Sequence, residues 1–231
     1  MITKTLRTLN GKIKVKIPTG LDEISIGQMI EMNKLDLATA ENIPLMPGLT
    51  REVLDNVIDY NELVDLQQHV LSLAHQIKYC YNETAIPEFV YFGQTKVKVI
   101  RNLSIEPAGA FLASRDLIAD EINKHIAEYG EDGWKENFNP SLDTVAMVLA
   151  HYFYCRVTGS LYVEQKAEEF KDEILKLPLQ TALPIARHFF LSYPDLLQQK
   201  LSLLQLWRMK WKSALALRRL KSSRTSTRSI L

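Results

Sequence analysis

The sequence has few of the residue types that usually build reactive or covalently linked sites. Its 231 residues include only two cysteines, Cys80 and Cys155, and each stands among aromatic residues. Free cysteine behaves as a small apolar residue, so we expect buried thiols in a reducing compartment, without a disulfide framework or a metal site. No His-Glu-x-x-His, Gly-x-Ser-x-Gly or phosphate-binding glycine run is present. We therefore expect no enzyme and no cofactor.

Long apolar runs are also missing. The longest candidate, Val145–Tyr154, contains His151 and is shorter than the eighteen or so residues that a membrane-spanning helix needs. Residues 1–19 contain Lys and Arg but no apolar segment, which argues against a signal peptide. We expect a soluble cytoplasmic protein with no membrane span.

Acidic residues are absent from the end of the chain. The formal net charge of the whole chain is +1, but nine Lys and Arg residues and no Asp or Glu lie from Lys200 onward. This leaves 19 basic and 27 acidic residues in 1–199, a formal charge of about −8. A basic arm beside an acidic body is typical of an interaction segment. The arm could meet nucleic acid, an acidic partner surface or the acidic body of a neighbouring copy.

Two segments share a pattern in which a short strand leads into a helix. Lys14–Ile17 and Lys96–Val99 alternate Lys with apolar residues, the pattern of a half-exposed strand. Asn10-Gly11 and Gly93-Gln94 are turn signals, so we expect one hairpin from residues 2–9 and 12–17 and a second over 86–99. The similarity suggests a degenerate internal duplication.

The remaining segments predict helices. Ser25 and Gln28 form a capping-box pattern, Thr50 can cap a second helix, and Asn61 starts a third. Ser104 is expected to open a helix that contains Pro107 in its first turn. Glycine and asparagine mark a loop over 129–140. Further helices are expected over 142–158, 163–176, 181–192 and 195–221.

These patterns predict a mainly α fold with two small β-hairpins. We divide the chain into an N-terminal hairpin with helices (1–85), a second hairpin with a helical bundle (86–200) and a basic amphipathic arm (201–231). The histidines are expected to be packed and hydrogen-bonded, because they are not spaced as metal ligands. Five carboxylates have the spacing of a solvated helix face: Glu164, Glu168, Glu169, Asp172 and Glu173.

The best binding candidate in the sequence is the C-terminal helix. Its apolar stripe with two tryptophans could lie at a membrane interface, on a partner helix or on the protein's own body. A basic flank and a basic tail accompany this stripe, and the tail would attract phosphates without reading bases. The partner-binding candidates are Trp207, Arg208, Trp211, Lys212, Arg218, Arg219, Lys221, Arg224 and Arg228.

The order of these segments resembles a family of tail or neck morphogenesis proteins of tailed bacteriophages, including crAss-like and related phages of gut bacteria. The resemblance spans roughly residues 12–196. It depends on Val15-Lys16-Ile17-Pro18-Thr19 followed by Glu23–Gln28, the helical segment Val53–Tyr81, Gln94–Val99 with Leu103-Ser104-Ile105, Val145–Tyr154 and Phe189-Phe190. It implies a non-enzymatic role in building the virion, with no catalytic residues. The basic tail after Lys200 departs from the pattern.

The leading hypothesis is a structural or assembly protein of the virion, made in the host cytoplasm. It would act through contacts with copies of itself and with other phage structural proteins, as a ring or oligomer component at the neck or tail. One alternative is a tail-assembly chaperone that is absent from the mature virion. Another is a packaged or ejected protein that contacts DNA through the basic C-terminal tail.

Overall fold

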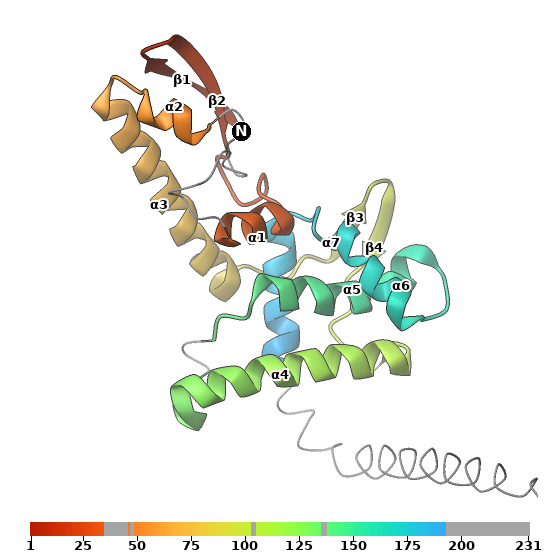
Figure 1. Ribbon diagram of the computed structural model, residues 1–231. Coiled ribbons are helices and arrows are strands. Elements are labelled where there is room, and N and C mark those ends of the chain that lie inside the picture. The colour runs from red at the N-terminus through yellow and green to blue at the C-terminus, as the bar shows by residue number, and fades with distance from the viewer. Residues whose placement is uncertain (35–45, 47–48, 103–104, 135–137, 193–231) are drawn as a thin grey trace, which may run out of the picture. The chain divides into compact units, whose positions relative to one another are not determined.

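The computed structural model describes residues 1–34, 46, 49–102, 105–134 and 138–192 (Figure 1). Residues Met1–Phe190 form one compact unit, which contains every labelled helix and strand. The expected helix over 195–221 and all nine partner-binding candidates from Trp207 to Arg228 lie outside the described residues. The proposal for a C-terminal arm therefore stays a prediction.

The first hairpin pairs β1 (Ile2–Thr8) with β2 (Gly11–Ile17) in antiparallel register. Its position was predicted, but the turn lies one residue earlier than expected. Thr8 pairs with Gly11, so Leu9 and Asn10 form the two-residue connection. Gly11 begins β2 with a φ of 117°, a conformation that glycine adopts without a steric penalty. On the inner face, Leu6, Val15 and Ile17 are buried.

Helix α1 (Ile26–Lys34) begins at the predicted capping box. The Gln28 backbone N–H donates to Ser25 Oγ at 3.2 Å, and the Ser25 N–H donates to Gln28 Oε1 at 3.0 Å. Two further N–H groups at this terminus, on Ile26 and Gly27, donate to the carbonyls of Leu177 and Leu175. The start of α1 is thus paired with a segment about 150 residues away in the sequence, which satisfies donors that a helix terminus leaves free.

Helices α2 (Arg51–Asp55) and α3 (Tyr60–Glu83) follow. The predicted cap at Thr50 is confirmed, because its hydroxyl accepts from the Val53 N–H at 3.2 Å. Asp59 caps α3 by accepting from the Asn61 N–H at 3.0 Å. On α3, Leu66 and Leu73 are buried.

The second hairpin pairs β3 (Phe89–Phe92) with β4 (Thr95–Lys98), and the predicted turn at Gly93-Gln94 is confirmed. The predicted start of the next helix is wrong: α4 (Ala108–Gly133) begins directly after Pro107, so the proline lies outside the helix. Pro107 has a ψ of 138°, which is extended backbone, and a helix can start only after it. Ser104 lies outside the described residues.

Helix α5 (Leu142–Thr158) has the predicted bounds and lies at the centre of the core. Ser141 caps it by accepting from the Thr144 N–H, and Gly159 ends it in the left-handed conformation. All but one of the residues Val145–Tyr154 are buried, so α5 is apolar on nearly every side. Helices α1 and α4, strand β4, and the helices α6 (Glu164–Glu169) and α7 (Lys171–Ile174) contact it.

Three details differ from the predictions for the second half. The single helix expected over 163–176 is split into α6 and α7 at Phe170, whose ψ of −12° interrupts the α-helix. This break lets the Phe170 ring pack against Phe92 and Tyr154, at 5.7 and 6.1 Å between ring centres. In the expected loop over 129–140, α4 continues but is kinked at Gly130. The last described helix spans 179–192, starting two residues before the predicted 181.

The architecture confirms the predicted class, mainly α with two small antiparallel hairpins. The division into regions 1–85, 86–200 and 201–231 and the internal duplication stay predictions. No helix in the described part of the chain is both long and apolar enough to cross a bilayer.

Candidate interaction surface

The four histidines whose side chains the structure describes hold separate segments together. A ring nitrogen of each of these four is within hydrogen-bonding distance of an atom in another segment. These contacts are His69 with the Pro18 carbonyl (2.7 Å), His125 with the Asn139 carbonyl (3.2 Å), His151 with the Tyr162 hydroxyl (2.9 Å) and His188 with the Arg101 carbonyl (3.0 Å). Across the described residues, no group of three or more His, Cys, Asp or Glu side chains could hold a metal ion.

His151, on α5, is 3% exposed and is the most buried of the histidines whose side chains the structure describes. Burial lowers its pKa from 6.5, and the nearby carboxylates Glu168 and Glu164 offset this only in part. Burial also raises the pKa of Tyr162 to about 12. Both groups are therefore neutral at pH 7, and their contact is a hydrogen bond between α5 and the 159–163 loop.

A second buried polar cluster attaches the segment before α4 to α5. The Tyr152 hydroxyl bonds both backbone groups of Ile100. One turn later on α5, the guanidinium of Arg156 pairs with Glu106, which is 9% exposed, and lies 5.1 Å from the centre of the Tyr152 ring. Replacing one member of such a pair leaves the other charge buried without a partner, which is strongly destabilising. The cluster therefore holds the segment before α4 in a fixed position on α5.

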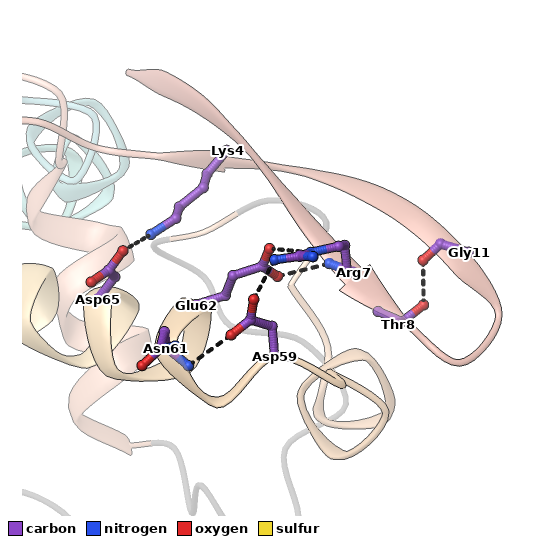
Figure 2. A network of polar contacts seen from close by, with 8 residues as sticks. All are labelled: Lys4, Arg7, Thr8, Gly11, Asp59, Asn61, Glu62 and Asp65. Carbon is purple, nitrogen blue, oxygen red and sulfur yellow. Dashed lines mark hydrogen bonds and ion pairs between the residues drawn. The ribbon is translucent and has the colours of Figure 1, made fainter.

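A network of ion pairs joins the first hairpin to the start of α3 (Figure 2). The Arg7 backbone N–H donates to Glu62 Oε2 at 2.8 Å, and its Nε donates to Oε1 at 3.0 Å. The Arg7 guanidinium also pairs with Asp59, and Lys4 Nζ lies 3.1 Å from Asp65. The hydrogen bonds from Arg7 lower the pKa of Glu62, while Glu62 and then Asp59 raise the pKa of Arg7. Glu62 thus stays ionised, and the network holds β1 in place.

Residues 56–58 extend the hairpin by pairing with the free edge of β1. The Leu9 N–H donates to the Asn56 carbonyl at 3.0 Å, and the Ile58 N–H donates to the Arg7 carbonyl at 2.9 Å. Thr8 and Val57 are therefore directly opposite in an antiparallel bridge. Because neighbours across a strand pair share a face, Ile58 lies on the same face as Arg7 and Leu9.

This outer face carries charge and apolar surface together. Lys12, Lys14 and Lys16 alternate along β2, and all three are exposed. No hydrogen bond or ion pair connects the side chain of any of these lysines to another group that the structure describes. At the tip, Leu9 is 74% exposed and Ile58 is 60% exposed. We call this surface, made of Lys12, Lys14, Lys16, Leu9 and Ile58, the lysine face.

Sequence reasoning found the alternating lysines but assigned them only to a half-exposed strand. It missed Leu9 and Ile58, because Ile58 joins the face through pairing with β1. The ion pairs of Arg7 were missed for the same reason, since Asp59 and Glu62 lie more than 50 residues away in the sequence. The lysine-apolar alternation was the one signal that could have located the surface.

Comparisons with known proteins bring no further assignment. No family model, curated protein or solved structure matches the chain.

Proposed function

We propose that the chain is a non-enzymatic structural or assembly protein of a tailed-phage virion. It acts through protein–protein contacts, as a ring or other oligomer component at the neck or tail. The lysine face is a contact surface for partner subunits, and the basic residues from Trp207 to Arg228 form a second one.

The observation that carries this proposal is the contrast between the core and the lysine face. The buried Glu121, Glu106 and His151 all have partners that hold segments of the fold together. On the lysine face, by contrast, the side chains of three lysines have no partner among the described residues, and two exposed apolar side chains lie at the tip. A centre of exposed apolar residues with charged neighbours is the composition of a protein-binding patch.

The anchoring of the hairpin supports the same function. A contact surface binds more tightly when it is already ordered, because less conformational entropy is lost on binding. The β1 edge is held by residues 56–58 and by the carboxylates of α3, while the Leu6, Val15 and Ile17 side chains bury the inner face. These contacts order the hairpin and leave the lysines of β2 exposed on its outer face.

Quantitative mass spectrometry of purified phage particles tests the proposal. A virion component is expected at a fixed copy number relative to the other structural proteins of the purified particle. Its absence from particles, together with abundance in infected cells, would contradict the proposal and favour a tail-assembly chaperone.

A further inference from the structure

The chain carries a second set of exposed apolar and charged side chains, whose charge is opposite to that of the lysine face. The loop after α5 presents Leu161, at 90% exposure, and Val163, at 46%. Helix α6 follows directly, and its Glu164 and Glu168 are exposed one turn apart. Asp172 of α7 is exposed as well. We call these five residues the acidic segment.

The carboxylates of the acidic segment are free to meet a partner. No hydrogen bond or ion pair joins Glu164, Glu168 or Asp172 to any other group in the described ranges. Their neighbour Glu173 differs, because it pairs with Lys176, and Lys171 pairs with Asp143. Three free carboxylates on the acidic segment thus correspond to three free ammonium groups on the lysine face.

We propose that the lysine face of one copy docks on the acidic segment of a second copy. This inference rests on the proposed function and names the partner of its contact surface. Leu9 and Ile58, at the tip of the hairpin, meet Leu161 and Val163, where burial of apolar area supplies affinity. Lys12, Lys14 and Lys16 face Glu164, Glu168 and Asp172 at the rim, where opposite charges speed encounter and fix the orientation.

The architecture of the assembly follows from the use of two different surfaces. When a surface binds a different surface on the next copy, the contact is head-to-tail, and a free surface remains only at the two ends of an open chain. Such a contact closes into a ring when the rotation between copies allows it, and otherwise forms an open chain. A symmetric dimer through one shared patch is not the expected product.

Charge reversal in the full chain tests the pairing. One variant carries K12E, K14E and K16E, a second carries E164K, E168K and D172K, and a third carries all six changes. We expect each three-site variant to lose the wild-type oligomer and to approach the monomer mass of 26.5 kDa in light scattering. The six-site variant restores complementary charges and should recover the wild-type mass.

A matched control reverses three other exposed carboxylates near the end of α4, Glu128, Glu131 and Asp132, and should leave the oligomer unchanged. Circular dichroism checks that every variant is folded. A further variant, L161S, removes the apolar centre without changing charge. It should raise the protein concentration needed for assembly at least tenfold.

The outcomes separate this inference from the proposed function. Oligomers of wild-type mass in both three-site variants would overturn the docking of these two surfaces and leave self-assembly intact. Loss of the oligomer without recovery in the six-site variant would also overturn the pairing. A wild-type chain that is monomeric in every condition would instead contradict the proposed homo-oligomer.

Discussion

The hydroxyl of Tyr152 binds both backbone groups of Ile100, accepting from its N–H at 2.6 Å and donating to its carbonyl at 2.9 Å. Ile100 follows β4, beyond the end of the strand pairing, so its backbone groups have no partner in the hairpin. Tyr152 is 1% exposed in the middle of α5. The central helix thus provides hydrogen-bond partners for the backbone that follows the second hairpin. These bonds fix the position of that hairpin on the core.

Replacing Tyr152 with Phe should therefore destabilise the fold. The change removes one oxygen and leaves a donor and an acceptor of Ile100 without their partner, which costs about 2 kcal/mol of unfolding free energy. For a chain of this length the melting temperature should fall by roughly 4–8 °C. Tyr154→Phe is the matched control on the same helix, because no hydrogen bond of its hydroxyl occurs within the described residues, and it should cost less than about 0.5 kcal/mol. Equal melting temperatures for the two variants would contradict this role of Tyr152.

The contact between Gly109 and Tyr162 predicts a second sensitive position. A methyl group on residue 109 would lie 2.5 Å from Cδ1 of Tyr162, so the ring must move away. This movement strains the hydrogen bond to His151, and Gly109→Ala should cost about 1–3 kcal/mol despite the better helix propensity of alanine. At Gly133 the nearest atom lies at 3.9 Å, so Gly133→Ala is the control and should be close to neutral. Urea denaturation of both variants measures the difference.

The pKa of His151 predicts a pH dependence of stability. Burial holds its pKa in the folded chain below the value of 6.5 expected when the chain is unfolded. Below pH 6.5 the unfolded chain binds a proton that the folded chain does not, so the free energy of unfolding falls as pH falls towards the folded pKa. The slope from this group is at most about 1.4 kcal/mol per pH unit.

His151→Gln removes this titration while leaving the carboxylates in place. Urea denaturation of wild type and variant at pH 7.5 and pH 5 isolates the contribution of the histidine. The loss of stability between the two pH values should be smaller in the variant. An equal loss in both proteins would show that His151 does not carry the effect.

The ion pairs of Arg7 predict a local change without a global one. Arg7→Gln removes the ion pairs of the guanidinium with Asp59 and Glu62, while the bond from the backbone N–H of residue 7 to Glu62 remains. The Arg7 side chain is 55% exposed, and ion pairs of an exposed side chain contribute little to global stability. We expect faster amide hydrogen exchange in residues 2–17 with an almost unchanged melting temperature. Lys12→Gln, on the same hairpin but without a described partner, should leave the exchange unchanged. Unaltered exchange in the Arg7 variant would mean that the β1 edge is held by its backbone contacts alone.

Local signals predicted the elements that depend on neighbouring residues. The Ser25–Gln28 capping box, the Thr50 cap, both hairpins and the bounds of α5 follow from side chains within a few positions of each other. Such interactions depend on the residue types at turns and helix termini, which can be identified from the sequence.

Features that depend on distant residues could not be predicted in the same way. The split between α6 and α7 accompanies the packing of Phe170 on Phe92, which is 78 positions away in the sequence. The start of α1 pairs with the carbonyls of Leu175 and Leu177, and the lysine face needs Ile58 to pair with β1. A single sequence does not reveal these contacts, because each depends on how elements distant in the sequence pack against one another.

The most direct test of the account is the mass of the full-length protein in solution as salt is varied. At low ionic strength we expect a defined multiple of 26.5 kDa by light scattering or sedimentation equilibrium. At about 1 M salt, where exposed charges are screened within about 3 Å, the mass should fall towards that of the monomer. A mass of 26.5 kDa at low salt and at every accessible concentration would contradict the claim that this chain works by binding copies of itself.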